Sequence, residues 1–397
     1  MHICYITQAG FDDPGAENTH ATEVIRHLVK AGVRVTVLHP SRHTSVRSLG
    51  ADERKPSVVR FGLRRIWFQM WLFFVLWRRP ADVDAIYVRQ AALMLIPALL
   101  RRRLGVPIVA EFNTYFGTRE NARGIPVLLR LLRIIERRGL KEYDRIIVIS
   151  SQLKKIITDE YGTPPGRIEV VHNGTNLDLM RPLPKIECRR ALQLPERAFV
   201  IAFVGSLYPW QGVSQLIDAV AELDRGASGD VHLVIAGTSR DLVRYKAQAS
   251  VLGLERRVHF LGAVDYERVP EIISAADVAA APGDPTESTN YRIRSPLKVY
   301  EYLACGRPVI AGELESLREL FSGDPVGFLI GPGNITHLVT AINTLRLDPG
   351  LAERMGSNAR RLADRLLSWS AVAERLLAIL RSVASDSAPT AARANRA

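Results

Sequence analysis

The side chains best suited to chemistry lie in residues 291–306, which read Tyr-Arg-Ile-Arg-Ser-Pro-Leu-Lys-Val-Tyr-Glu-Tyr-Leu-Ala-Cys-Gly. Ser295 offers an oxygen that can cap a helix, and Pro296 suits the first helical position, where a missing N–H costs nothing. Gly306 favours the left-handed turn that ends a helix. The stretch therefore predicts a short helix with free N–H groups at its Ser295 end.

Positive side chains gather at this predicted helix start, although cations oppose the positive end of the helix dipole. Arg292, Arg294 and Lys298 are reasonable there if an anion lies between them, and phosphate fits such a site best. The alternative is an ordinary surface helix in which Lys298 and Glu301 pair one turn apart, worth about 0.3 kcal/mol. Taken alone, the stretch favours neither interpretation.

Length and composition allow two ordinary domains with sizeable cores, since 47% of the 397 residues are apolar. Cys4, Cys188 and Cys305 are isolated thiols, which indicates a reducing compartment and argues against zinc or a disulfide scaffold. The first residues enter a strand pattern without a basic region, so we expect no signal peptide. We expect a cytoplasmic protein.

The net positive charge is concentrated in the first part of the chain. Up to Met180 there are 27 Lys and Arg against 17 Asp and Glu, whereas the remainder has 26 against 24. This excess predicts a polyanionic partner: anionic lipid, nucleic acid or a phosphorylated substrate. Nucleic acid is the weakest of the three, because aromatic-rich binding motifs for RNA or DNA are missing.

Short apolar runs alternate with amphipathic helical patterns along the chain, which predicts an α/β fold with mainly parallel sheets. We expect one domain over 1–178 and a second over 179–368, joined by a polar connection that begins at Asn173 and contains Pro182 and Pro184. The predicted strands are 3–7, 33–39, 85–89, 108–112, 145–150, 168–172, 200–205, 231–237, 258–262, 278–282, 308–312 and 326–330. Residues 351–380 are expected to be helical, and 382–397 to be a disordered tail.

Two basic, apolar stretches of the first domain suggest contact with a membrane. The run 66–77 would form a helix of about 18 Å, too short for a hydrocarbon core of about 30 Å. Its Trp67, Trp71 and Trp77, between paired arginines, suit a helix lying in the lipid interface. A second such stretch, 125–138, carries Arg130 and Arg133 beside several leucines. The alternative is that the first stretch simply packs into the domain core.

Four segments resemble the family-4 retaining glycosyltransferases of the GT-B fold. They are Val-His-Asn-Gly-Thr-Asn-Leu-Asp at 171–178, Phe-Val-Gly-Ser-Leu-Tyr-Pro-Trp-Gln-Gly at 203–212, Val-His-Phe-Leu-Gly at 258–262 and Ser-Pro-Leu-Lys-Val-Tyr-Glu-Tyr-Leu-Ala-Cys-Gly-Arg-Pro at 295–308. The last is similar to a Ser-Pro-Leu-Lys form of the family's C-terminal motif. The resemblance implies two Rossmann-like domains facing across a cleft, with the helix at about 369–381 packing back on the first.

The family pattern implies a nucleoside-diphosphate-sugar site made largely by the second domain. Glu301 would accept hydrogen bonds from the ribose diol, and the turn from Ser295 to Leu297 would offer N–H groups to the diphosphate. The resemblance gives the following donor-binding residues: Gly15, Gly205, Ser206, Gln211, Arg294, Ser295, Leu297, Lys298 and Glu301. Gly212 would help to shape the same wall.

The chain also departs from the family pattern. Ser206 and Gln211 stand where Arg and Lys are common, so we expect Lys298 and Arg294 to supply the missing phosphate contacts. Ile293 occupies the position of the first glutamate of the E-x7-E pair, and Glu287 is a candidate replacement. Asn113 stands near the position of the usual active-site histidine, and it can orient a sugar hydroxyl but cannot shuttle a proton.

We therefore expect transfer of a sugar, with retention, to a hydroxyl of a lipid-linked or polysaccharide acceptor at an anionic membrane surface. Asn113, Lys298 and Glu287 are the predicted catalytic residues, with no metal and no cofactor. Asp82 and Asp84 have the spacing of metal-dependent glycosyltransferases, but they are better explained as the start of a strand. The alternatives are a sugar-nucleotide epimerase of the same fold and a catalytically silent, membrane-bound nucleotide- or glycan-binding protein.

Overall fold

The computed structural model describes residues 1–8, 11, 16–40, 46–54, 64–78, 82–89, 96–114, 126–225, 230–284 and 296–387. The chain forms two compact units. One contains residues 1–173 and the segment that starts at Trp369, and the other is Gly174–Ser368. The sequence placed the boundary at 178, a few residues further along.

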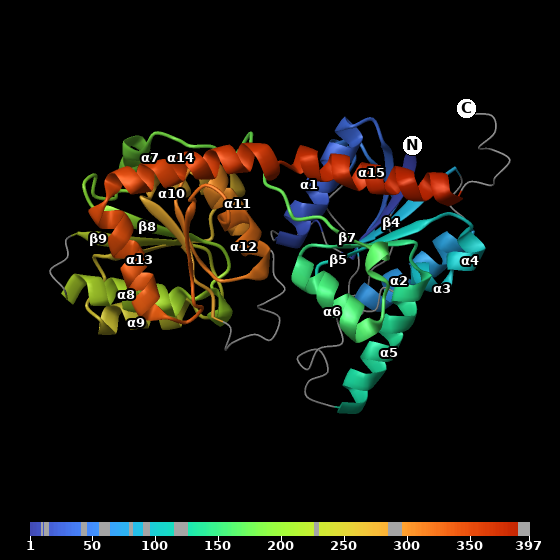
Figure 1. Ribbon diagram of the computed structural model, residues 1–397, viewed down its shortest axis with the longest axis horizontal. Coiled ribbons are helices and arrows are strands. Elements are labelled where there is room, and N and C mark those ends of the chain that lie inside the picture. The colour runs from blue at the N-terminus through green and yellow to red at the C-terminus, as the bar shows by residue number, and fades with distance from the viewer. Residues whose placement is uncertain are drawn as a thin grey trace. The chain divides into compact units, whose positions relative to one another are not determined.

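The first unit is built on a parallel sheet (Figure 1), and the described residues give it the strand order β3-β2-β1-β4-β5-β6-β7. Its strands are β1 (His2–Ile6), β2 (Arg34–Leu38), β3 (Asp52–Arg54), β4 (Ala85–Arg89), β5 (Ile108–Phe112), β6 (Arg145–Val148) and β7 (Ile168–Val170). The helices are α1 (Ala16–Lys30), α2 (Arg64–Trp77), α3 (Ile96–Leu99), α4 (Arg101–Leu104), α5 (Pro126–Glu142), α6 (Ser151–Tyr161) and α15 (Trp369–Ser387), with 3₁₀ turns η1 (Val46–Leu49) and η2 (Pro165–Arg167).

The second unit repeats this architecture with the order β10-β9-β8-β11-β12-β13 among its described residues. Its strands are β8 (Phe199–Val204), β9 (Val231–Ala236), β10 (Val258–Gly262), β11 (Val278–Ala281), β12 (Val309–Gly312) and β13 (Gly327–Ile330). The helices are α7 (Lys185–Ala191), α8 (Val213–Arg225), α9 (Leu242–Val251), α10 (Val269–Ala275), α11 (Leu297–Ala304), α12 (Glu315–Phe321), α13 (Ile335–Leu347) and α14 (Pro349–Leu366), with 3₁₀ turns η3 (Pro209–Gln211) and η4 (Tyr266–Arg268).

Both faces of the second sheet are buried, and strand β8 is accordingly apolar throughout. Val200 and Ala202 belong to a core that includes α10, α11 and α14, whereas Ile201 and Phe203 belong to one that includes α8, α9 and α13. The pattern follows from the alternation of side chains along a strand and from helices covering both faces of a parallel sheet. The strand order reverses between β8 and β11, and such a switch point is where open α/β sheets bind ligands.

Several sequence predictions need correction. Strand β3 was not foreseen. Helix α11 begins at Leu297, with Pro296 rather than Ser295 at the cap position and no side-chain cap bond. The helical run expected over 351–380 breaks between Leu366 and Trp369. The disordered tail expected from 382 is wrong as far as Ser387, because α15 continues that far and buries Val383.

Within the first unit, α15 packs on α1 and reaches β4. Trp369 is buried, and its indole meets the ring of His20 edge-on with 5.1 Å between centroids. Asp84 precedes β4, and its Oδ2 accepts a 2.7 Å hydrogen bond from the backbone N–H of His2 on the neighbouring strand. This hydrogen bond supports a structural role for Asp84 at the start of β4.

Candidate functional site

The switch point of the second unit is crowded around Gly205, which directly follows β8. Its φ is +138°, a conformation that side chains rarely adopt. A Cβ there would lie 2.7 Å from Nζ of Lys298. Glycine at 205 therefore leaves the space through which the Lys298 side chain reaches the end of β8.

Lys298 is held by contacts on two sides. Its Nζ donates a 3.0 Å hydrogen bond to Oε1 of Gln211, and the Gln211 amide in turn donates to Oγ of Ser206 at 3.4 Å. The ammonium also lies 3.9 Å from the centroid of the Phe203 ring, a cation–π contact. Three residues predicted separately from sequence thus form one polar cluster at the carboxyl end of β8.

Helix α11 is fixed to this strand end by Tyr302. The buried hydroxyl of Tyr302 accepts a 2.8 Å hydrogen bond from the N–H of Val204 and donates a 3.2 Å bond to its carbonyl. Both polar groups of the last β8 residue are therefore satisfied by one side chain. The link sets the position of the first turn of α11, which carries Leu297 and Lys298, against Gly205.

Glu301 lies one turn further along α11. The Tyr266 hydroxyl donates a 3.0 Å hydrogen bond to its Oε1. Burial raises the pKa of Glu301 above its ordinary value, and this effect outweighs the opposing effects of Tyr266 and Lys298. Donors supplied by a ligand would stabilise the ionised carboxylate, so Glu301 is suited to bind a pair of neighbouring hydroxyls.

Two further glycines allow the loops of the site to approach one another closely. A Cβ at Gly237, where φ is +142°, would lie 1.8 Å from the carbonyl oxygen of Gly205, and a Cβ at Gly212 would lie 2.8 Å from the N–H nitrogen of Gly283. The N–H of Asp284 also donates to the Trp210 carbonyl at 2.9 Å. The segments after β8, β9 and β11 are thus packed backbone to backbone, a pairing that cannot be read from the sequence.

The structure brings together six of the residues predicted to bind the donor: Gly205, Ser206, Gln211, Leu297, Lys298 and Glu301. Gly15, Glu287, Arg294 and Ser295 lie outside the described residues. Sequence reasoning missed Tyr302 and Tyr266. Tyr302 lies on the predicted helix, but its partner Val204 is 98 residues away, and Tyr266 is 35 residues away from Glu301.

A second polar group lies in the first unit at the carboxyl end of β5. Asn113 follows the strand and donates a hydrogen bond to Glu111. Oε1 of Glu111 also lies 3.2 Å from Nε2 of His20, and the Tyr87 hydroxyl donates to Oε2. Burial lowers the pKa of His20 to about 4, so His20 is neutral near pH 7.

Glu111 is the residue that organises this group. Burial alone would raise its pKa, but His20, the Arg89 guanidinium and the donors Tyr87 and Asn113 together hold that pKa below its ordinary value. His20 is not among the residues predicted from the sequence to form a site. The signal that would have found it is the charged Glu111 inside an otherwise apolar strand, since a buried carboxylate needs partners.

Helices α2 and α5 of the first unit carry the residues predicted to touch a membrane. One face of α2 is core, with Phe68, Leu72 and Leu76 buried, so the core alternative holds for that face. The other face exposes Trp67 by 38%, Phe74 by 61% and Trp77 by 46%. Trp71 is half-buried between the two faces.

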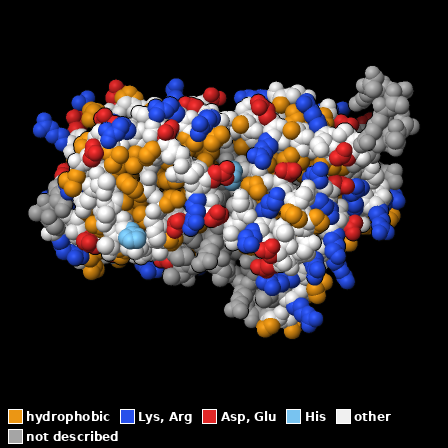
Figure 2. Space-filling view, viewed as in Figure 1, with side chains coloured by type: hydrophobic (Ala, Val, Ile, Leu, Met, Phe, Trp, Pro, Cys, Tyr) orange, Lys and Arg blue, Asp and Glu red, His pale blue; other side chains and the backbone are white. Residues whose placement is uncertain are grey.

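The amino-terminal half of α5 also exposes apolar and basic side chains together. Val127, Leu131 and Ile134 are exposed, as are Arg130 and Arg133. Hydrophobic and basic side chains accordingly lie side by side at the end of this helix (Figure 2). Helix α3 contacts both α2 and α5. The exposed faces of these two helices are together called the α2–α5 surface: Trp67, Phe74 and Trp77 on α2, and Val127, Arg130, Leu131, Arg133 and Ile134 on α5. Within the described residues, none of the helices is long and apolar enough to cross a membrane.

Comparison with known families assigns both units. Residues 184–362 match the family described as "Glycosyl transferases group 1", and residues 17–179 match "Glycosyltransferase Family 4". A D-inositol 3-phosphate glycosyltransferase of Mycobacterium bovis is 30% identical over 96% of this chain and 82% of its own length. The chain belongs to the group 1 glycosyltransferases.

Other members and solved structures agree with this assignment. A D-inositol 3-phosphate glycosyltransferase of Geodermatophilus obscurus is 28% identical over 99% of this chain and 90% of its own length. Alr3699/HepE of Anabaena in complex with UDP has a TM-score of 0.77 at 20% identity, covering 96% of this chain and all of that one. A glycosyltransferase of Rickettsia africae has a TM-score of 0.75 at 17% identity, over 96% and 98% of the two chains. The fold of this group 1 glycosyltransferase is GT-B, as its sequence motifs predicted.

Proposed function

We propose that this glycosyltransferase moves a sugar, with retention, from a nucleoside-diphosphate sugar to a hydroxyl of a lipid-linked or polysaccharide acceptor. The observation that carries the proposal is the cluster of Lys298, Gln211 and Ser206 beside Gly205, with Glu301 one helical turn away. A diphosphate beside Lys298 and the first turn of α11 would leave its ribose within the range of Glu301. UDP complexes of the Anabaena protein, which has the same fold, support this type of donor.

Charge stabilisation accounts for the chemistry without a metal ion. As the glycosidic bond to the donor breaks, negative charge grows on the leaving diphosphate, and preorganised donors aimed at that charge lower the barrier. Lys298 and the N–H groups at the start of α11 supply such donors. The leaving phosphate can itself accept the proton of the acceptor hydroxyl, and this arrangement keeps attack and departure on one face of the sugar.

Asn113 is the proposed sugar-orienting residue of the first unit. Its amide is already engaged by Glu111, which fixes how the side chain is presented. An amide can accept and donate hydrogen bonds but cannot transfer a proton, so it suits a mechanism that needs no general base. Glu287 stays a proposal for the donor sugar, since it lies outside the described residues.

The α2–α5 surface supports an acceptor carried by a membrane. Exposed aromatic side chains such as Trp67 and Phe74, and an arginine on the ring of Trp77, are typical of proteins that lie at an anionic lipid interface. We propose a peripheral position at the inner face of the membrane, with that surface towards the lipid. An acceptor anchored in the same bilayer would then diffuse in two dimensions to the enzyme.

The proposed function is tested by thermal-shift screening against UDP, GDP and ADP sugars, followed by turnover assays with acceptor. The correct donor raises the melting temperature, because it binds only the folded protein. It should be consumed only when acceptor is added, in EDTA as well as in Mg²⁺, and NMR of the product should show the anomeric configuration of the donor. Conversion of donor without acceptor would instead indicate an epimerase, and binding without turnover a silent binding protein.

A second acceptor class is favoured by the relatives. Those of Mycobacterium bovis and Geodermatophilus obscurus bear the name D-inositol 3-phosphate glycosyltransferase. The acceptor assay should therefore compare inositol 3-phosphate in solution with lipid-linked glycans in vesicles. Faster transfer to the soluble inositol phosphate would replace the lipid-linked acceptor in the proposal.

A further inference from the structure

A cavity of about 850 Å³ lies in the second unit, at the edge of the sheet opposite to Gly205. Phe199 at the start of β8 lines it, as do Asp230, Asp277 and Pro308, which directly precede β9, β11 and β12. Strand β8 separates this edge from the loop at Gly205 by about 20 Å, at about 3.3 Å per residue. The cavity is therefore distinct from the proposed donor site.

Positive side chains outnumber negative ones in the lining. The cations are Lys185, Arg189, Arg197, Arg307, Arg346 and Arg360, and the carboxylates are Asp230, Asp277 and Glu353. Two of the carboxylates already have cationic partners. Asp277 pairs with Lys185 at 2.8 Å and with Arg189 at 2.6 Å, and Asp230 pairs with Arg257 outside the lining.

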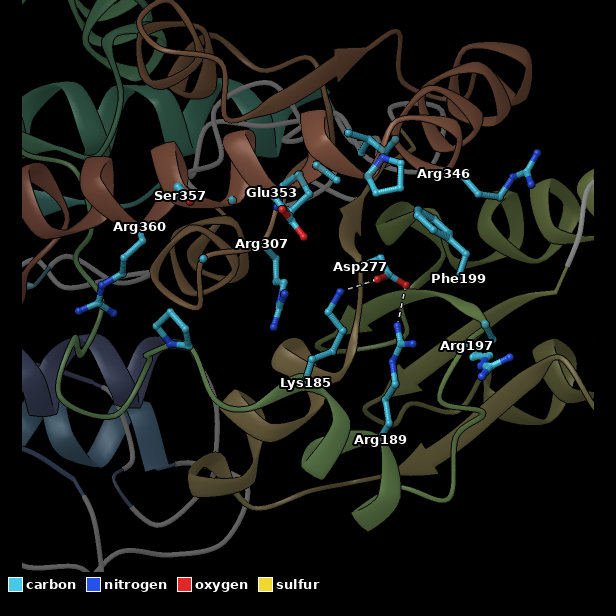
Figure 3. A pocket seen from close by; sticks show the side chains of 18 of the residues that line it. Lys185, Arg189, Arg197, Phe199, Asp277, Arg307, Arg346, Glu353, Ser357 and Arg360 are labelled. Atoms are coloured by element: carbon cyan, nitrogen blue, oxygen red, sulfur yellow. Dashed lines mark hydrogen bonds and ion pairs between the residues drawn. The ribbon is translucent and has the colours of Figure 1, made fainter.

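Among the cations that the structure describes in the lining, Arg307 has an unpaired buried donor, and it points into the cavity (Figure 3). Its Nη2 donates a 2.7 Å hydrogen bond to the Ser274 carbonyl, whereas its buried Nε has no acceptor among the described residues. The Asp277 carboxylate acts on the Arg307 guanidinium through its charge, but its ion pairs in the described part of the chain are with Lys185 and Arg189. Arg307 as a whole is half-buried and lines the cavity, so the remainder of its guanidinium can bind an anionic ligand.

The shape of the cavity limits what that ligand is. Its volume lies within the usual range for small-molecule sites, about 300–1,000 Å³, which is far more than a bare phosphate needs. Phe199, Leu345 and Ala352 provide apolar lining besides the cations. Arginine recognises phosphate oxygens with paired donors, and an aromatic side chain can stack on a ring.

We propose that this cavity binds a phosphate ester with a ring-shaped body, the phosphate on Arg307 and the ring against Phe199. The site is placed to act on helix α11. Arg307 follows that helix after one glycine turn, and Arg360 donates at 2.8 Å to the carbonyl of Ala304, its last residue. A ligand on Arg307 therefore binds at one end of the helix whose other end carries Lys298.

The test uses AMP as the probe, titrated by calorimetry into the full chain with the nucleoside diphosphate of the screened donor present at saturation, so that the proposed donor site is filled. AMP should bind at least tenfold more tightly than inorganic phosphate or adenosine. Arg307→Gln should weaken AMP binding by at least about tenfold, since one hydrogen bond to a charged group is lost. Arg346→Gln, at the rim of the cavity, should weaken it by a smaller factor.

Matched controls separate the cavity from general charge effects and from misfolding. Arg244→Gln with Lys246→Gln removes two exposed cations of α9 and should leave AMP affinity unchanged. Arg346→Gln should keep the melting temperature of the parent protein, so its binding result is read without a folding defect. Equal AMP affinity in the Arg307 and α9 variants, equal binding of inorganic phosphate, or no AMP binding by the parent would each overturn the proposal.

Discussion

Replacing Lys298 with methionine is the sharpest test of how the proposed donor is held. The substitution keeps the apolar part of the side chain but removes the ammonium that contacts Gln211 and the Phe203 ring. A hydrogen bond between a charged donor and a phosphate contributes about 1.5–3 kcal/mol, so donor affinity should fall about 10- to 160-fold.

The same substitution should change stability only slightly. The lost cation–π contact with Phe203 is worth about 0.5–1 kcal/mol at a partly exposed site, and the bond to Gln211 about 1 kcal/mol. Each kcal/mol shifts the melting temperature of a domain of 150–250 residues by about 2–4 °C. Together the two losses predict a fall of about 3–8 °C, so loss of donor binding in a protein that melts within this range would reflect the missing charge.

Calorimetry with UDP and with the sugar nucleotide found by screening measures this effect. Gln211→Leu is the companion variant, and it should cost only about 2- to 12-fold because its amide is neutral. Lys246→Met, on an exposed face of α9, is the control for removing a lysine. The reasoning fails if Lys298→Met binds donor within twofold of the parent, or if Gln211→Leu loses more affinity than Lys298→Met does.

Three other changes test other parts of the molecule. Glu301→Gln should lower UDP affinity about tenfold. In this variant UDP affinity should no longer fall at acid pH, because the residue that is protonated there in the parent is missing. The pKa of Glu301 is raised on folding, so the folded state holds an extra proton between the unfolded and folded pKa values. Ionised Glu301 therefore lowers the stability of the nucleotide-free protein at pH 7. By urea denaturation, nucleotide-free Glu301→Gln should be at least as stable as the parent at this pH. Gly237→Ala, which would drive a Cβ into the Gly205 carbonyl, should cost about 2–5 kcal/mol by denaturation and weaken donor binding. Trp67→Ser with Phe74→Ser should weaken sedimentation with phosphatidylglycerol vesicles about 10- to 30-fold, since each partly buried ring contributes about 1 kcal/mol.

Each of these changes has a control within the chain. Glu267→Gln removes an exposed carboxylate close to Tyr266 and should leave UDP affinity unchanged. Gly253→Ala places a Cβ at a positive φ in open space, so it isolates backbone strain from collision. Val243→Ser with Val251→Ser alters exposed apolar residues of the second unit. Vesicle binding that is lost equally in the valine variant, or that is as strong on neutral phosphatidylcholine, would contradict the membrane proposal.

Much of the fold follows from local patterns in the sequence. The strands at 85–89, 108–112 and 258–262 have the predicted bounds, because each is an apolar run closed by polar or turn residues. Strand β3 could not be predicted, since Asp-Glu-Arg carries no apolar alternation and forms by pairing with Thr36–Leu38 at the sheet edge. Its partner, rather than its own side chains, determines its structure.

The candidate site was only partly predictable for a related reason. Gly205, Gln211 and Lys298 could be named from their motifs, but the contact between Lys298 and Gln211 joins residues 87 positions apart. The group around Glu111 joins α1, β4 and β5 in the same manner. Such pairings depend on strand order and on side-chain geometry, which a single sequence does not encode locally. The cationic cavity at Arg307 was invisible for the same reason.

The close packing of Gly237 on Gly205 has a consequence for attempts to change the proposed donor specificity of this glycosyltransferase. Grafting the segment 205–212 from a relative would leave the host residues at 237–239 and 282–284 facing a foreign backbone. The 2.9 Å bond from Ser239 to the carbonyl of residue 207 would form only if that backbone followed the same path. The three segments therefore have to be exchanged as one module. Chimaeras that swap a single loop should be recovered as poorly folded proteins rather than as enzymes of altered specificity.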